Sequence, residues 1–239
     1  NRTINSLAMK KYILHLLLAL VTSAAVHAQS YQDFQRYLSE AKSGNKNAQF
    51  NVGLFYHTGM AGVKEDYQQA AYWYRKAADQ GQINAQVNLG YLYFNGIGVT
   101  QDYSQAYYWY RKAADQGDAH SMYKLGTIYY QGHGVAKDLK QAAYWYEKAA
   151  EKGYMDAQKD IADMYADGEG VSEDHVKAVK WYTLAADQGH FFSQNRLIIY
   201  YTECERSKPM NQIKIGRFIA ECRKKANLTQ MQLAEKLGI

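Results

Sequence analysis

Small and apolar positions recur along the chain in a pattern that predicts pairs of short helices. From residue 85, such positions fall at i, i+4, i+5 and i+8, which is the spacing of one helical face: Ala85, Leu89, Gly90 and Tyr93. A second face of this kind follows, carried by Ala106, Trp109, Tyr110, Ala113 and Ala114. A Gly-x-Gly connection separates the two stretches and another glycine follows the second. Each stretch therefore predicts one helix bounded by glycine.

The four tryptophans of the chain lie at a fixed interval of 36 residues, and a tyrosine follows each of them. A constant period of this length is typical of a solenoid built from stacked helical repeats. In register, the repeats cover 48–84, 85–120, 121–156 and 157–192, the first with one extra loop residue. We expect 29–47 and 193–207 to be half-repeats that cap the two ends of the stack.

Polar residues at fixed positions predict where the second helix of each repeat begins and ends. An aspartate stands at the expected N-cap in all four repeats: Asp66, Asp102, Asp138 and Asp174. A glycine stands where a left-handed residue would end the helix: Gly81, Gly117, Gly153 and Gly189.

The repeating unit resembles the Sel-one-like repeat, a relative of the tetratricopeptide repeat. Its pattern A-x₃-[VLI]-[GA]-x₂-Y-x₂-G-x-G-V-x₂-D-x₃-A-x₂-W-Y-x₂-A-A-x₂-G occurs four times across residues 48–192. The resemblance implies an all-α fold, a right-handed α-α superhelical solenoid of about four and a half helix-pair repeats. It also implies an adaptor role without naming a partner.

Repeated aromatic residues are expected to form the core between neighbouring helix pairs, where each buries roughly 150–250 Å². The predicted core comprises Trp73, Trp109, Trp145, Trp181, Tyr56, Tyr93, Tyr129 and Tyr165. An aromatic series at the repeat period is typical of a core, and no cofactor is expected.

First-helix positions that vary between repeats are candidates for a concave binding surface, because exposed aromatic residues are enriched at interfaces. They are Phe50, Leu54, His57, Val87, Tyr91, Phe94, Tyr123, Thr127 and Tyr130, followed in the fourth repeat by Lys159, Asp160, Asp163 and Asp167. The three aspartates share one helical face and favour a basic group in a ligand. The alternative is that these side chains simply pack on the neighbouring helix.

Charge is distributed unevenly along the chain. The net charge is +5, but residues 1–28 contribute +3 and residues 208–239 contribute +5, which leaves −3 for residues 29–207. The repeats are thus mildly acidic, and we expect no nucleic-acid partner for them. The two cysteines, Cys204 and Cys222, and the scattered histidines form no spacing typical of a metal site, and none is expected.

Residues 9–28 have the layout of a secretory signal peptide. Two lysines precede the apolar run 13–21, and the small-residue site Val26-His27-Ala28 follows. The run is too short to span a bilayer, so no integral membrane span is predicted. We expect an exported protein, periplasmic or secreted, and interpret residues 1–8 as an upstream extension that is not native.

The segment 208–239 differs from the repeats. From Met210 it resembles the start of a phage-repressor-like helix-turn-helix domain, but the recognition helix of such a domain would begin after Ile239. One interpretation is that 210–239 does not belong to the native protein. The other is a native amphipathic helix pair packed on the stack.

Catalytic motifs are sparse. Cysteine-rich relatives of this repeat are associated with penicillin binding, so the S-x-x-K matches that begin at Ser39, Ser43 and Ser121 are candidates for a β-lactamase-like or cell-wall-acting enzyme. No S-D-N or K-T-G accompanies them at a usable distance. We favour a non-enzymatic scaffold of the bacterial envelope that binds a protein or extended peptide. A DNA-binding regulator is the third hypothesis, and the oligomeric state stays open.

Export is predicted to depend on the apolar run. Replacing Leu16, Leu17 and Leu18 with Asp should trap the precursor in the cytoplasm, because the targeting machinery recognises the hydrophobicity of this segment. Fractionation and intact mass would measure the outcome, with mature protein expected to start at Gln29. Normal periplasmic recovery of the triple variant would show that the segment is not a signal.

Overall fold

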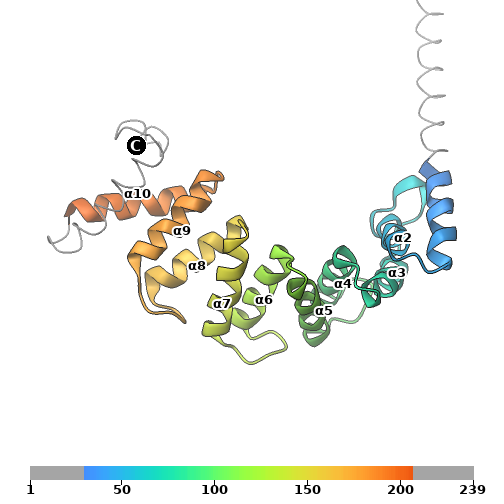
Figure 1. The fold of residues 1–239 in the computed structure, drawn as a ribbon, viewed down its shortest axis with the longest axis horizontal. Helices are drawn as coiled ribbons and strands as arrows, with labels where there is room; N and C mark the ends of the chain where they lie inside the picture. Colours follow the sequence, from blue (N-terminus) through green and yellow to red (C-terminus); the bar gives the residue numbers. More distant parts are fainter. Residues whose placement is uncertain (1–29, 207–239) are drawn as a thin grey trace, which may run out of the picture. The chain divides into compact units, whose positions relative to one another are not determined.

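The structure is a computed structural model that describes residues 30–206 (Figure 1). The predicted upstream extension 1–8, the signal peptide 9–28 and the segment 208–239 all lie outside the described residues. No helix in the described range is both long enough and apolar enough to cross a membrane.

The described residues form ten helices and one short 3₁₀ turn, which confirms the all-helical repeat architecture. A helix over residues 30–42 comes first. It is followed by α2 (Lys46–Thr58), η1 (Met60–Gly62), α3 (Tyr67–Asp79), α4 (Ile83–Asn95), α5 (Tyr103–Asp115), α6 (Ala119–Gln131), α7 (Leu139–Glu151), α8 (Met155–Asp167), α9 (His175–Asp187) and α10 (Phe191–Arg206).

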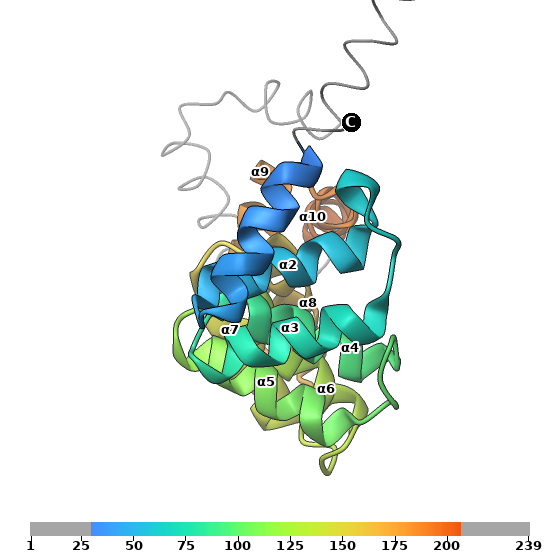
Figure 2. The same ribbon diagram turned by 90° about the vertical axis from the view of Figure 1, so that its right-hand side faces the viewer.

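The helices divide into two compact units, and the boundary falls inside α5, between Lys112 and Ala113. In the first unit, the helix over 30–42 packs with α2 and α3 around Phe34, Val52 and Trp73 (Figure 2), and α3 packs on α4. In the second unit, α6 to α10 pack each on the next in chain order. Sequential packing of this kind is what a repeat array requires.

The predicted helix boundaries are confirmed at both ends of the second helices. The carboxylate of Asp66 accepts the backbone N–H of Gln69 at 3.0 Å, and Asp138 and Asp174 cap α7 and α9 in the same way. Asp102 accepts the N–H groups of two residues at the start of α5. The glycines after these helices have φ between +78° and +94°, a conformation that glycine adopts without steric cost.

The two helices of a repeat approach closely because one contact residue is glycine or alanine. A Cβ added to Gly126 of α6 would lie 2.4 Å from the ring of Tyr146 on α7, and one on Gly53 of α2 would lie 2.6 Å from Tyr74 on α3. The fourth repeat has Ala162 at this position, and the alanine is fully buried. The small residue therefore leaves the space that the tyrosine ring occupies.

Burial differs among the aromatic residues predicted to form the core. The four tryptophans are 2–8% exposed and Tyr165 is 6% exposed, as expected. Tyr56, Tyr93 and Tyr129 are only partly buried. The deepest tyrosines are instead those that follow each tryptophan: Tyr74, Tyr110, Tyr146 and Tyr182. In the first three repeats, their rings lie against the glycine of the first helix.

Trp109 provides a test of this core. It is 2% exposed within a cluster that includes Tyr74, Leu89 and Leu92, so Trp109→Ala should lower the free energy of unfolding by roughly 3–5 kcal/mol through lost burial and a new cavity. The half-exposed Tyr72 is the control, and Tyr72→Ala should cost much less. Denaturant titrations measure both, and a cost for Trp109→Ala below about 1 kcal/mol would contradict a core role.

Candidate binding site

In the first unit, three of the predicted binding residues pack against neighbouring side chains. The ring of Phe50 lies 5.8 Å from that of Tyr74, and Nδ1 of His57 is 3.3 Å from the hydroxyl of Tyr74. Phe94 makes an edge contact with Tyr103 at 5.2 Å. For these residues, the alternative interpretation of packing on the neighbouring helix describes the structure.

Two other predicted residues of this unit remain on the surface. Leu54 and Tyr91 are exposed, whereas Val87 is half-buried. Leu54 also lines a small cavity of about 150 Å³, together with Tyr37, Asn51, Phe55, Thr58 and Met60. The first helices of this unit thus present isolated apolar contact points.

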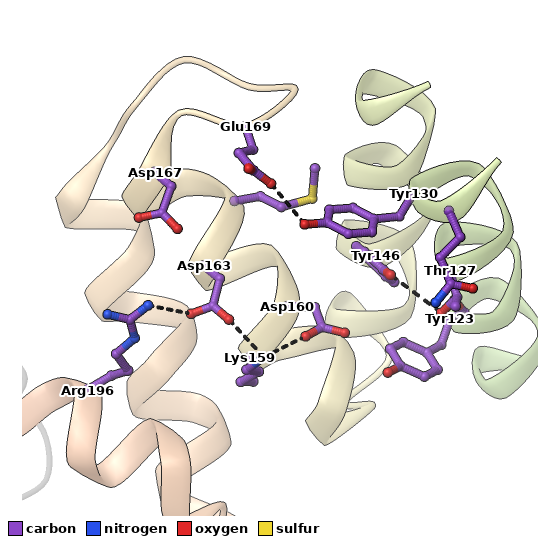
Figure 3. A pocket seen from close by; sticks show the side chains of 12 residues that line it. Tyr123, Thr127, Tyr130, Tyr146, Lys159, Asp160, Asp163, Asp167, Glu169 and Arg196 are labelled. Atoms are coloured by element: carbon purple, nitrogen blue, oxygen red, sulfur yellow. Dashed lines mark hydrogen bonds and ion pairs between the residues drawn. The ribbon is translucent and has the colours of Figure 1, made fainter. Parts of the chain in front are cut away.

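In the second unit, the structure brings all seven predicted residues into one pocket of about 390 Å³ (Figure 3). Its lining comes from three consecutive first helices, α6, α8 and α10, with a tyrosine from α7 and a glutamate from the loop after α8. The lining residues are Tyr123, Thr127, Tyr130, Gln131, Tyr146, Lys159, Asp160, Asp163, Met164, Asp167, Glu169 and Arg196.

Lys159 holds two of the predicted aspartates. Its Nζ lies 3.0 Å from Oδ1 of Asp160 and 2.8 Å from Oδ2 of Asp163. Burial by itself would lower the pKa of Lys159, but the hydrogen bonds and charges of the two carboxylates outweigh it and raise that pKa above its ordinary value. The lysine therefore stays charged and neutralises much of the acidic cluster from within the same helix.

Asp163 has two further partners that come from other helices. The hydroxyl of Tyr182 on α9 donates to Oδ1 of Asp163. Nη2 of Arg196 on α10 lies 3.6 Å from the same oxygen. Burial and the hydrogen bond to Asp163 raise the pKa of Tyr182, so its hydroxyl stays protonated as a donor. Asp163 thus ties three helices together and is not a free carboxylate.

Two carboxylates at one end of the pocket remain more open. Asp167 ends α8 and its side chain is exposed. Glu169 accepts a hydrogen bond of 3.1 Å from the hydroxyl of Tyr130. With two cations and four carboxylates in the lining, the pocket carries a formal charge of −2. The attraction that the sequence predicted for a basic group therefore concentrates at Asp167 and Glu169, which we call the acidic end.

Tyrosine rings form the opposite wall. The ring of Tyr123 lies 5.5 Å from that of Tyr146 and 5.0 Å from that of Tyr154. The hydroxyl of Tyr154 is 3.0 Å from Nδ1 of His120 at the start of α6. Burial, followed by the charge of Asp160, raises the pKa of Tyr123 well above its ordinary value. This wall is neutral at physiological pH and offers flat apolar surface together with hydroxyl donors.

Five of the lining residues are not among those predicted from the sequence: Gln131, Tyr146, Met164, Glu169 and Arg196. Arg196 lies 36 residues after Asp160, so the repeat register contained a signal for it. Tyr146 belongs to a second helix and reaches the pocket through its hydroxyl, which donates to Thr127 at 3.4 Å. Such a contribution from the other helix of the pair leaves no mark on the first-helix pattern.

Two of the serines considered for catalysis differ in their exposure. Ser121 is fully buried at the position where Ala85 and Ala157 stand in neighbouring repeats, so its hydroxyl cannot meet a substrate. Ser39 is exposed on the helix over 30–42. Between residues 30 and 200, no three His, Cys, Asp or Glu side chains are placed to hold a metal ion.

Comparison with known proteins identifies the repeat. The Sel1 repeat profile matches residues 46–82, 83–118, 119–154 and 156–190. A Sel1 repeat protein from Oxalobacter formigenes is 36% identical with a TM-score of 0.66, covering 80% of this chain and 75% of its own. A protective antigen of uropathogenic Escherichia coli with an SLR fold is 39% identical with a TM-score of 0.69, covering 71% of this chain and 36% of its own.

A curated relative matches over a shorter stretch. The ERAD-associated E3 ubiquitin-protein ligase component HRD3A of Arabidopsis thaliana is 39% identical over 67 residues, which is 28% of this chain. The match covers only 10% of that relative's length. It therefore supports a shared repeat, and no property of the whole plant protein is transferred to this chain.

His120, which contacts Tyr154 of the tyrosine wall, predicts a pH dependence of stability. Burial, and then the charge of Lys124, lower the pKa of His120, against the opposing effects of Asp118 and Asp156. Because the folded pKa lies below the unfolded value of about 6.5, the unfolded chain takes up the proton first. The stability contribution of neutral His120 is thus complete above about pH 6.5 and is lost as pH falls.

Wild type should therefore lose more stability on acidification than His120→Gln, which cannot titrate. Urea unfolding of both proteins between about pH 7.5 and pH 5 measures the difference. Parallel pH profiles would contradict the assigned pKa direction.

Proposed function

Because the chain belongs to the Sel1 repeat family, we propose that it is an exported, non-enzymatic scaffold that binds a protein or extended peptide through the first helices of its repeats. The export part is supported by the signal-peptide layout of residues 9–28. The binding part is supported by the geometry of the second unit.

The pocket across α6, α8 and α10 is the observation that carries this proposal. It gathers all seven variable first-helix residues that the sequence analysis selected in repeats three and four. Its volume of about 390 Å³ falls within the range of roughly 300–1,000 Å³ typical of ligand pockets. A groove that continues over successive helices suits an extended segment better than a compact small molecule.

The lining indicates the chemistry of that segment. Tyr123 offers contact surface for an apolar or aromatic side chain, and such anchors supply most of the affinity at interfaces. Asp167 and Glu169 favour a basic group at the other end, which mainly speeds association and sets orientation. We therefore propose a partner segment with an apolar anchor and a basic residue a few positions away.

Site-specific photo-crosslinking in the full chain tests the surface. A benzophenone side chain at Thr127 or Tyr130, both on α6 in the lining of the pocket, should crosslink one and the same envelope protein in producing cells. The same group at Tyr144, half-exposed on the second helix α7, is the matched control and should not. Crosslinks that arise only from position 144 would move the binding surface to the second helices.

Binding measurements with that purified partner give the energetic test. Tyr130→Ala should weaken binding by roughly 1–2 kcal/mol, because an aromatic contact surface of the pocket is lost. Asp167→Lys should slow association, and raised salt should suppress its effect. Asp167 is preferable to Asp163 for this purpose, since replacing Asp163 would also break its bonds to Lys159 and Tyr182. Wild-type binding by both folded variants would exclude this surface.

A further inference from the structure

The pocket already contains an arginine of the chain itself. Arg196 extends from α10 toward Asp163, and Nη2 lies 3.6 Å from Oδ1 (Figure 3). That separation is an ion pair but exceeds a hydrogen-bond distance. The side chain of Arg196 is 44% exposed. A guanidinium has five N–H donors, so this single loose contact leaves most of its bonding capacity to solvent.

The acidic end has accepting capacity that Arg196 does not use. Tyr182, Asp163 and Asp167 raise the pKa of Arg196 against the opposing effect of burial, so the guanidinium interacts with Asp167 of the acidic end as well as with Asp163. Nevertheless, Asp167 is exposed, and Glu169 accepts a hydrogen bond from Tyr130. Lys159 cannot fill the gap, because its Nζ is held between Asp160 and Asp163.

The aromatic side of the pocket is suited to the same kind of group. Tyr130 lines the pocket next to Glu169, and Nζ of Lys137 lies 5.4 Å from the centroid of its ring. This ring therefore already attracts a cation. A planar guanidinium stacks flat on aromatic rings and binds carboxylates with two parallel hydrogen bonds, whereas a lysine ammonium acts as a point charge.

We propose that the acidic end binds an arginine side chain of the partner segment, and that Arg196 competes for this end in the free protein. The inference rests on the proposed function and specifies the ligand class of that same pocket. The incoming guanidinium would pair with Asp167 and Glu169 beside Tyr130. Arg196 would then act as a built-in competitor that weakens binding of any segment without a well-placed arginine.

The ligand class is tested with short peptide probes and the full chain. The probe is acetyl-Tyr-Gly-Arg-Gly-amide, compared by calorimetry with peptides that carry lysine or citrulline in place of arginine. Citrulline keeps the shape of the side chain but has no charge. We expect the arginine peptide to bind at least about tenfold more tightly than the citrulline peptide, with lysine in between. Equal affinities for arginine and citrulline would overturn the inference.

Two variants with opposite expected effects on peptide affinity test whether Arg196 competes with the arginine of the peptide. Arg196→Gln should tighten the arginine peptide by about threefold or more, since it removes the competitor, and Asp167→Asn should weaken it by about fivefold or more. Two controls carry the same charge changes elsewhere on this unit: Lys140→Gln on α7, and Asp187→Asn at the end of α9, as Asp167 is at the end of α8.

If Lys140→Gln and Arg196→Gln increase the affinity for the arginine peptide equally, the increase is an effect of net charge. That result would overturn the inference that Arg196 competes for the acidic end. Thermal unfolding confirms that each variant is folded, and Asp167→Asn tests the site even if Arg196→Gln loosens α10. If no peptide binds while Asp167→Lys still impairs the crosslinked partner, the arginine inference fails and the proposed function stands. If the first-helix variants also leave binding of that partner unchanged, both the arginine inference and the proposed function fail.

Discussion

The contact between a small residue on the first helix and a tyrosine ring on the second is the constraint on which each repeat depends. At Gly126 and Tyr146, and again at Gly53 and Tyr74, no room exists for a Cβ unless the ring moves. Because the two helices are held this closely, the tryptophan that precedes each tyrosine is buried between neighbouring helices.

The same tyrosines connect the core to the candidate binding face of the first helix. Their rings are buried, but their hydroxyls reach side chains of the first helix in the same repeat: His57 from Tyr74, Thr127 from Tyr146 and Asp163 from Tyr182. Burial raises the pKa of Tyr74 to about 12, so this hydroxyl keeps its proton at physiological pH. A packing residue therefore also orients a residue of the binding face, which makes the pocket wall a rigid part of the repeat.

Intramolecular ion pairs change the character of the pocket. A row of aspartates on α8 suggests an open anionic surface, but Lys159, Tyr182 and Arg196 engage two of the three. Partly buried carboxylates need such partners, because desolvation without pairing is costly. What remains for a ligand is a smaller and more directional acidic end, next to tyrosine rings. This arrangement supports the proposed selectivity for a flat cation over a general attraction for basic proteins.

The sequence by itself determined the repeat, its helices and its caps, since each depends on residues close together in the chain. Asp66 caps the helix that begins one residue later, and Gly81 ends that same helix. The 36-residue period also predicted the row of variable first-helix residues that lines the pocket, because these residues occupy equivalent positions in every repeat.

Only the tertiary structure decided which members of the row are available. Phe50 and His57 pack on Tyr74, whereas Tyr123 and Asp167 line a pocket. Arg196 enters that pocket from α10 and meets Asp163, 33 positions earlier in the chain. Periodicity describes the direction of a side chain on its own helix, but burial and ion pairing depend on what the neighbouring helices bring to the same space.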